Sequence, residues 1–247
     1  MMKLLIDAGN TRIKWQLRDE GSVLASGAGN LDDGELFTGI ASPQWKSLSG
    51  IAVSTVRSEA ARLQLEQAIA GYTTVPVRFY WTRKQFGSLT CAYSDPSTMG
   101  ADRWHAMVGA WSQVAGSCVV VDAGSAITID WIDGRGNHTG GYILPGRMMM
   151  TGSLRQATAR VLFEDSAAML STAPGRSTAE CVFHGVNWLM QVLASELGRS
   201  STIPVLVTGG DGFYIKKALD SMGGSCTVES RLCPGLVLDG LALVEAE

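Results

Sequence analysis

The chain has 247 residues and a net charge of −3, with 46% hydrophobic and 17% charged residues, which is an ordinary globular composition. This length allows one large domain or two small ones. There is no basic excess to favour a nucleic-acid partner, and the apolar runs are far shorter than the roughly 20 residues of a membrane span. A short apolar run broken by Asp7 argues against an amino-terminal signal peptide.

The cysteines form an odd set without any Cys-x-x-Cys pair: Cys91, Cys118, Cys181, Cys226 and Cys233. Together with three scattered histidines, this pattern argues against a zinc site. Reduced thiols are typical of the cytoplasm, so we expect a cytoplasmic protein. We interpret His105 and His184, on expected helix faces, as structural groups, and we expect His138 to be exposed after a turn.

The first half of the chain predicts three strands followed by alternating helices and strands. The strands are expected at 3–7, 12–18 and about 22–27, followed by a short helix after Asp32-Asp33, a strand at 51–53, a helix over about 58–70 and a strand at about 75–81. Apolar residues recur with helical spacing from Trp104 to Trp111, which predicts a further helix.

The second half repeats the pattern. Strands are expected at 117–121, up to Trp131, near 138–144 and at 203–207, with a helix at 212–221, a short strand near 226–228 and a terminal helix from about 235. A helix over 182–193 begins at a capping box, Ser177 to Glu180. We therefore predict a mixed α/β fold with an N-terminal lobe at 1–115 and a C-terminal lobe at 116–247.

The triplet Asp-Ala-Gly occurs once in each half, at Asp7-Ala8-Gly9 and at Asp122-Ala123-Gly124. Each copy ends an apolar run and leads into a second strand-like stretch. The repetition suggests two related lobes with one phosphate-binding turn each, as in enzymes that clamp a nucleotide between two lobes. Phosphoryl transfer is therefore the first hypothesis for function.

The first turn combines the residue types that phosphate binding needs. Gly9 allows a tight turn and a close approach, Asn10 and Thr11 offer donors, and Lys14 carries a positive charge. Asp7 would repel phosphate unless a cation such as Mg²⁺ lies between them, directly or through water. The alternative is an ordinary β-hairpin with an Asx-type turn.

The second turn has the same features. Asp122 can hold a cation, and Gly124 and Ser125 can bond phosphate oxygens. A third cluster, Thr208-Gly209-Gly210-Asp211-Gly212, lies between an expected strand and an expected helix, where anions and ribose edges commonly bind. A plain strand-to-helix loop is the alternative for this cluster.

Several segments in this order resemble type III pantothenate kinases: Asp7-Ala8-Gly9-Asn10-Thr11-x-x-Lys14, Tyr93-x-x-Pro96-x-x-Met99-Gly100-Ala101-Asp102-Arg103-Trp104, Asp122-Ala123-Gly124-Ser125-Ala126-x-Thr128, Gly140-Gly141-Tyr142-Ile143-Leu144-Pro145-Gly146, Ser177-Thr178-Ala179 and Thr208-Gly209-Gly210. That family, which includes relatives of the Bvg accessory factor type, belongs to the acetate-kinase, sugar-kinase, Hsp70 and actin superfamily. The resemblance implies two similar RNase H-like lobes with a nucleotide cleft between them. The Gly-Ala-Asp-Arg segment is its most specific part.

The resemblance implies ATP-dependent phosphorylation of pantothenate to 4'-phosphopantothenate, the first step of coenzyme A biosynthesis. It also implies Mg²⁺, a monovalent cation (K⁺ or NH₄⁺) and a homodimer. Asp122 resembles the monovalent-cation ligand, and Asp7 a ligand of Mg²⁺ through water. The ATP contacts that it implies are Asp7, Ala8, Gly9, Asn10, Thr11, Arg12, Ile13, Lys14 and Ser125, the last where the family usually has Thr.

For pantothenate, the resemblance implies a pocket formed by Tyr93, Gly100, Ala101, Asp102, Arg103 and Thr178. Asp102 resembles the acceptor of the hydroxyl proton, and Arg103 suits the pantothenate carboxylate. Thr178 resembles a contact from the partner subunit. The alternatives are that Asp102 caps its helix, that Arg103 pairs at the surface, and that Thr178 merely follows a helix cap.

Two other functions remain open at this point. One is another small-molecule kinase of the superfamily, such as a sugar or polyphosphate enzyme, against which the Gly-Ala-Asp-Arg segment and Tyr93 argue. The other is a non-catalytic regulator with the same fold. A degenerate regulator would be expected to lack at least one charged site residue, yet all are present: Asp7, Lys14, Asp102, Arg103 and Asp122.

Overall fold

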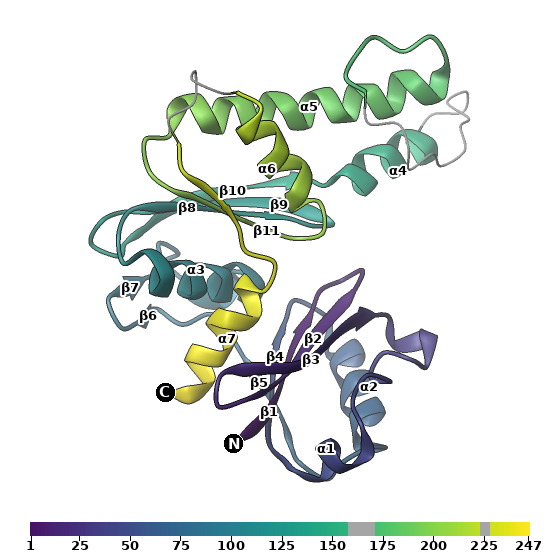
Figure 1. Cartoon of the computed structure of the whole chain (residues 1–247), viewed down its shortest axis with the longest axis vertical. Coiled ribbons are helices and arrows are strands. Elements are labelled where there is room, and N and C mark those ends of the chain that lie inside the picture. Colours follow the sequence, from purple (N-terminus) through teal and green to yellow (C-terminus); the bar gives the residue numbers. More distant parts are fainter. Residues whose placement is uncertain (158–170, 223–227) are drawn as a thin grey trace. The chain divides into compact units, whose positions relative to one another are not determined.

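The computed structural model describes residues 1–157, 171–222 and 228–247, which divide into two compact units (Figure 1). The first unit, unit 1, comprises Met1–Gly116, Ile132–Thr139 and Gly235–Glu247. The second, unit 2, comprises Ser117–Trp131 and Gly140–Pro234. The first division therefore lies one residue beyond the expected lobe boundary, but two later segments belong to unit 1.

Unit 1 is built on a five-stranded sheet with the order β3-β2-β1-β4-β5. The strands are β1 (Met2–Ala8), β2 (Ile13–Asp19), β3 (Ser22–Gly29), β4 (Leu48–Thr55) and β5 (Val77–Tyr80). The central strand β1 is antiparallel to β2 and parallel to β4. Because successive side chains of a strand point to opposite faces, Leu4 and Ile6 lie in one core and Leu5 lies in another.

Helices cover both faces of this sheet. The remaining elements of the unit are η1 (Leu31–Asp33), α1 (Ser42–Lys46), α2 (Glu59–Ala70), β6 (Gln85–Phe86), β7 (Leu89–Thr90), η2 (Pro96–Thr98), α3 (Ala101–Val114) and α7 (Leu236–Ala246). On one face, Leu65 and Ile69 of α2 join the core that contains Leu4. On the other, Leu238 and Leu241 of α7 pack with Leu5.

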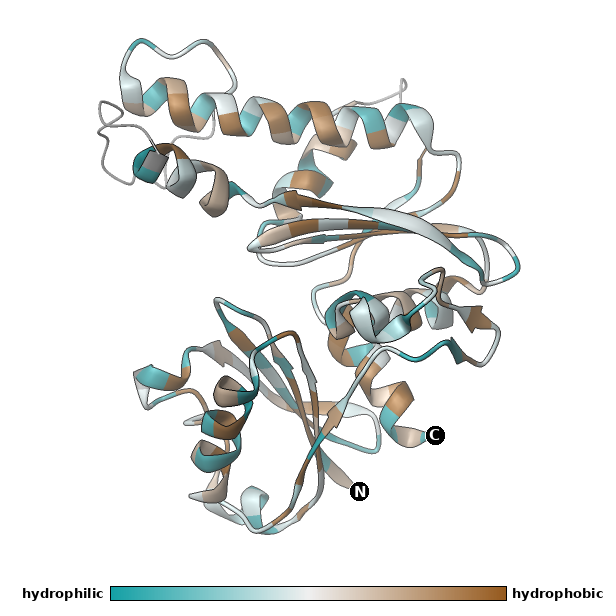
Figure 2. Cartoon of the chain, turned by 180° about the vertical axis from the view of Figure 1, so that it is seen from behind, coloured by the Kyte–Doolittle hydropathy of each residue, from teal (hydrophilic) through white to brown (hydrophobic). Residues whose placement is uncertain are grey.

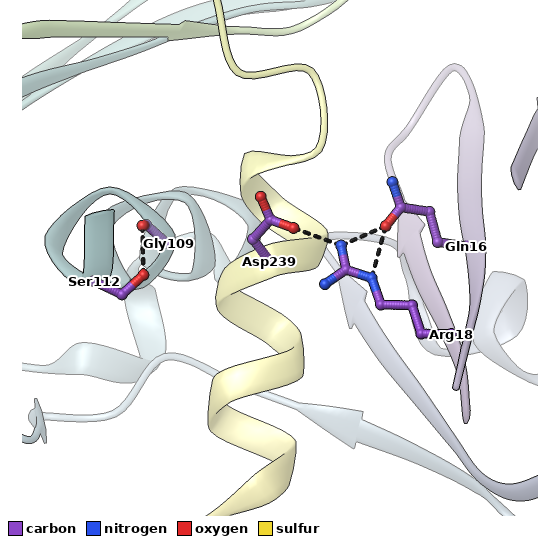
Figure 3. Close-up of polar contacts among 5 residues, drawn as sticks. All are labelled: Gln16, Arg18, Gly109, Ser112 and Asp239. Atoms are coloured by element: carbon purple, nitrogen blue, oxygen red, sulfur yellow. Dashed lines mark hydrogen bonds and ion pairs between the residues drawn. The ribbon is translucent and has the colours of Figure 1, made fainter. Parts of the chain in front are cut away.

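The terminal helix α7 belongs to unit 1 because its contacts are there. A Cβ added to Gly109 of α3 would lie 2.5 Å from the carbonyl oxygen of Leu236, so the two helix backbones touch. Arg18 of β2, which also bonds Gln16, pairs with Asp239 at 2.5 Å (Figure 3). The segment Ile132–Thr139 joins the same unit, since Thr90 donates to the carbonyl of Gly136 at 2.8 Å.

Unit 2 has a sheet with the corresponding order, β10-β9-β8-β11-β12. Its strands are β8 (Cys118–Ala123), β9 (Ala126–Ile132), β10 (His138–Pro145), β11 (Val205–Thr208) and β12 (Ser230–Leu232), and its helices are α4 (Arg147–Ala157), α5 (Thr178–Ser200) and α6 (Gly212–Asp220). Val121 packs with Met190 of α5 and Ile215 of α6. Stretches of the strands in both five-stranded sheets are brown in Figure 2, the colour of hydrophobic residues.

The sequence predicted most of these elements, because their apolar periods and turn residues are local signals. It did not predict α4 or the short β6–β7 pair. The strand expected near 226–228 falls partly outside the described residues, and β12 begins at Ser230. In the described part of the chain, no helix is long and apolar enough to cross a membrane.

Candidate active site

The first Asp-Ala-Gly triplet ends β1, and the chain returns as β2 after a four-residue turn. Asp7 and Lys14 are directly opposite each other in the antiparallel register, so their side chains share one face of the sheet. Asn10, Thr11 and Arg12 are exposed, and Arg12 Nη2 donates to the carbonyl of Ala28 at 3.4 Å. The predicted ATP residues from Asp7 to Lys14 therefore form one continuous hairpin end, whereas Ser125 lies in unit 2.

This turn has a support that the sequence analysis missed. Arg57, just after β4, donates from Nε to the carbonyl of Gly9 at 2.7 Å and from Nη2 to the carbonyl of Asn10 at 3.1 Å. Thr55 Oγ1 donates to the carbonyl of Ala8 at 3.1 Å and accepts the N–H of Arg57 at 3.0 Å. No local motif marks Arg57, since its partners lie 47 and 48 residues away.

The predicted proton acceptor, Asp102, lies in the first turn of α3. Its Oδ1 accepts the N–H of Arg103 at 2.7 Å, whereas the N-cap position belongs to Gly100. A Cβ on Gly100 would lie 2.5 Å from that same Oδ1. Because Gly100 has no Cβ, the Asp102 carboxylate can occupy this space.

Asp7 and Asp102 lie on the same side of the unit 1 sheet. Ser54 is the partner of Asp7 in the parallel β1–β4 register, and its hydroxyl is 2.7 Å from Nδ1 of His105. His105 lies one helical turn after Asp102 on α3, and residues at this spacing share a helix face. A Cβ on Gly100 would also lie 3.4 Å from Val56, just after β4, so the first turn of α3 lies beside the carboxyl end of that strand.

Arg103 and Tyr93 are in direct contact. Arg103 Nη1 donates to Tyr93 Oη at 2.9 Å, and its guanidinium lies 5.7 Å from the centre of the tyrosine ring. The Arg103 side chain is only 5% exposed, which excludes the alternative of a surface ion pair. These two predicted pantothenate residues therefore belong to one cluster.

The expectation that His138 is exposed was wrong. Its side chain is 3% exposed, and its ring stacks on that of Tyr93 with 6.3 Å between centroids. The backbone N–H of Ala92 also approaches His138 Nδ1, at 3.4 Å. The reason is tertiary: the turn before His138 packs on the segment around Thr90, which covers the histidine.

The second triplet ends β8 in unit 2, and the third glycine cluster packs directly on it. Asp122 is the register partner of Thr208, and the N–H of Asp211 donates to the carbonyl of Ala123 at 2.8 Å. Gly209 has φ +91°, and a Cβ there would lie 2.5 Å from Asp122 Oδ1. Gly146 donates to the carbonyl of Ser125 at 2.9 Å.

Arg147, which no prediction singled out, connects the elements around this cluster. Its Nη2 donates to Asn187 Oδ1 at 2.9 Å, its Nη1 lies 3.6 Å from Asp211 Oδ1, and its guanidinium is 4.2 Å from the Tyr214 ring centre. Burial raises the pKa of Asp211, and the charge and hydrogen bond of Arg147 oppose that increase. Arg147, Asn187 and Tyr214 also line a cavity of about 260 Å³.

Thr178 opens α5 next to the capping residue Ser177, whose hydroxyl accepts the N–H of Glu180 at 3.2 Å. The threonine is exposed and lines a groove of about 1040 Å³ on unit 2. Residues of α4 and α5 form much of its wall, including Met150, Leu154, Val182 and Leu189. The groove is thus mainly apolar beside Thr178.

Within the described residues, no group of three or more His, Cys, Asp or Glu side chains could by itself hold a metal ion. Asp7 and Asp122 instead provide single carboxylates at strand ends. Mg²⁺ is commonly bound by one or two carboxylates plus substrate phosphates, and carboxylate oxygens also suit other hard cations. Both side chains therefore fit a cation that is held jointly with a phosphorylated substrate.

Comparison with known proteins identifies similar sequences along the chain. The model of the family described as "Type III pantothenate kinase" matches residues 3–199. A type III pantothenate kinase of Marinobacter nauticus is 44% identical over 244 residues, covering 97% of this chain and 96% of that protein. One from Alcanivorax borkumensis is 34% identical over 256 residues, covering 99% of each.

Solved structures share the fold at lower identity. A putative Baf family transcriptional activator from Campylobacter jejuni has a TM-score of 0.58 at 21% identity, with 98% of each chain covered. A putative 2-dehydro-3-deoxygalactonokinase from Sinorhizobium meliloti has a TM-score of 0.58 at 18% identity, covering 99% of this chain and 98% of that one. The expected two-lobed α/β fold class is thereby confirmed.

Proposed function

This chain belongs to the type III pantothenate kinase family, and we propose that it transfers the γ-phosphoryl group of ATP to pantothenate with the residues described above. The observation that carries the proposal is the family match over residues 3–199, which includes the Asp7 hairpin and Asp102. The product, 4'-phosphopantothenate, is the first intermediate toward coenzyme A. We propose a cytoplasmic location, where ATP is available.

The hairpin from Asp7 to Lys14 is assigned to the ATP phosphates. Backbone N–H groups of the turn and the Lys14 ammonium suit phosphate oxygens, and Ser125 supplies a further hydroxyl contact. Asp7 would hold Mg²⁺ through water, and Asp122 would bind K⁺ or NH₄⁺. These cations would neutralise charge on the phosphates when bound.

Asp102 is assigned to the acceptor hydroxyl of pantothenate. The hydroxyl oxygen forms a bond to the γ-phosphorus, the bond from that phosphorus to the bridging oxygen breaks, and ADP leaves. Asp102 orients the hydroxyl and accepts its proton late in the transfer, because the transition state is loose and depends mainly on positioning. The packing of α3 holds the carboxylate in place for this step.

The cluster of Arg103 and Tyr93 is assigned to the other end of pantothenate. A guanidinium can bind a carboxylate through two parallel hydrogen bonds. The 2.9 Å bond to Tyr93 Oη and the low exposure of Arg103 fix the direction of its side chain. Gly100 and Ala101 complete this pocket at the start of α3.

A homodimer through α4 and α5 is the proposed assembly, with Thr178 reaching the partner's pantothenate. Trp188 is 54%, Leu189 47% and Val192 45% exposed on α5, which is an unusual concentration of large apolar side chains on one helix. We expect Trp188→Glu to give a monomer in sedimentation equilibrium and to raise the KM for pantothenate. Phe213→Glu, at another exposed aromatic, should leave the dimer intact.

An ADP-release assay with ATP, Mg²⁺ and K⁺ tests the function directly. We expect release that depends on pantothenate. Release that depends on a sugar would instead indicate another kinase of the superfamily, and none with any acceptor would indicate a non-catalytic regulator. Either result would contradict the proposal.

Replacing Asp102 tests its role within that reaction. We expect Asp102→Asn to lower kcat by a factor of about 100 or more, with ATP affinity retained, because general bases typically contribute this much. Asp220→Asn, which removes an exposed carboxylate paired with Lys216, is the matched control. Near-normal turnover of Asp102→Asn would show that another group accepts the proton.

A further inference from the structure

A side chain from outside the hairpin bonds the turn between β1 and β2. The strand pairing ends at Ala8 and Ile13, so the residues between them lie beyond the β-ladder. Arg57 forms hydrogen bonds with this turn: its Nε donates to the carbonyl of Gly9 and its Nη2 to the carbonyl of Asn10. Two consecutive peptide groups therefore turn their oxygen atoms toward one guanidinium.

Peptide geometry fixes what those two groups present on the other side. No peptide bond in the described residues is cis. In a planar trans peptide, the C=O and the following N–H point in opposite directions. The N–H groups of Asn10 and Thr11 consequently point away from Arg57, both to the same side. Adjacent N–H groups of a turn that point to the same side can bind an anion together.

Arg57 is itself held in place by the sheet. Its backbone N–H is bonded to Thr55 Oγ1, and that hydroxyl bonds the carbonyl of Ala8 at the end of β1. Thr55 is 2% exposed, so this link lies inside the unit. The chain of bonds joins the end of β4 to the end of β1 and to the first two residues of the turn.

We infer that Arg57 is a positioning residue, which orients the N–H groups of Asn10 and Thr11 toward the phosphates of ATP. This inference rests on the proposed function of the hairpin. The guanidinium also polarises the two peptide groups, which strengthens their N–H groups as donors. Arg57 acts through the backbone, whereas Lys14 supplies charge to the phosphates.

The central experiment compares three variants by steady-state kinetics and thermal unfolding. Arg57→Ala removes both bonds, and Arg57→Lys retains a positive charge but not the planar fork that reaches two carbonyls. Arg78→Ala removes an exposed arginine from β5 of the same unit. Hydrogen bonds to charged groups are worth about 1.5–3 kcal/mol.

For Arg57→Ala we expect kcat/KM for ATP to fall at least about tenfold, as that range implies. The KM for pantothenate should change by less than about twofold, and Arg57→Lys should recover less than half of the loss. Arg78→Ala should match the unchanged protein. This split between the two substrates would not follow from a general loss of structure.

Three results would overturn the inference. They are an unchanged kcat/KM for ATP in Arg57→Ala, a full recovery in Arg57→Lys, and a parallel increase of both KM values with a lowered unfolding temperature. If the unchanged protein lacks pantothenate-dependent ADP release, the proposed function fails instead. In that case the role of Arg57 is tested by calorimetric titration of the variants with Mg-ATP. A tenfold weaker affinity of Arg57→Ala would support the role, and an unchanged affinity would contradict it.

Discussion

The two Asp-Ala-Gly turns end equivalent central strands, β1 and β8, of sheets with the same strand order, yet they are supported differently. In unit 1, the turn is held by a side chain, because Arg57 bonds its carbonyls. In unit 2, the turn packs against backbone, because Gly146 and Gly209 approach it without a Cβ between. A repeated local sequence thus acquired two different supports.

The difference predicts how each turn responds to substitution. A side chain that is removed leaves carbonyls in an exposed turn, where water can replace the bonds at moderate cost. A methyl group added at Gly146 or Gly209 would overlap neighbouring atoms, most of which are backbone atoms of β8 or of the turn that follows it. The unit 2 turn should therefore be the more sensitive of the two.

The largest effect is expected for Gly209→Ala. Its Cβ would overlap the carbonyl of Ala123 and lie 2.5 Å from Asp122 Oδ1, at a φ of +91°. Strained backbone of this kind costs on the order of 1–3 kcal/mol, and the displaced Asp122 should lower kcat/KM at least about 100-fold. Activity assays and thermal unfolding measure the two losses.

Gly210→Ala is the matched control, since no atom lies within 4 Å of a Cβ there and its φ is not in the left-handed region. We expect it to remain close to the unchanged protein. If both alanine variants had similar activity and stability, the contrast between side-chain and backbone support would be wrong.

Gly100→Ala should have an intermediate effect and sharpens the comparison within unit 1. Its Cβ would meet the Asp102 carboxylate, a side chain that can rotate away, so we expect a loss of stability of only about 1 kcal/mol. Because the carboxylate moves, kcat should fall about tenfold or more, with the KM for ATP little changed. Gly71→Ala, whose nearest atom would be 3.6 Å away, provides the control in steady-state assays. A pure KM effect would contradict this prediction.

The smallest effect at neutral pH concerns His105 of unit 1. Burial, with a smaller contribution from the charge of Arg83, lowers the pKa of His105 from 6.5 to about 3. The unfolded chain therefore takes up a proton below pH 6.5 that the folded chain rejects until about pH 3. The free energy of unfolding should fall with decreasing pH across this window, by up to about 1.4 kcal/mol per pH unit.

Urea unfolding at several pH values tests this dependence through its slope. His105→Gln should show a shallower decrease than the unchanged protein, because glutamine does not titrate. His184→Gln, at a partly exposed histidine of α5, is the matched control. Equal slopes in all three proteins would contradict the assignment to His105.

Much of the candidate site was predictable because it consists of short contiguous segments. The turn at Asp7 and the start of α3 at Gly100 are each specified by neighbours within a few residues. Arg57, His138 and Arg147 were not recognised, since each makes its informative contacts with residues tens of positions away. A single sequence contains no local pattern that reports such pairs.

By itself the sequence determined the repeated succession of strands and helices along the chain and the two acidic turns, since apolar period and turn chemistry act over neighbouring residues. Tertiary structure alone decided that α7 joins unit 1, that His138 is covered by Tyr93, and that different supports hold the two turns. The physical reason is that burial and close packing depend on which distant segments meet, and those contacts exist only once the chain has folded.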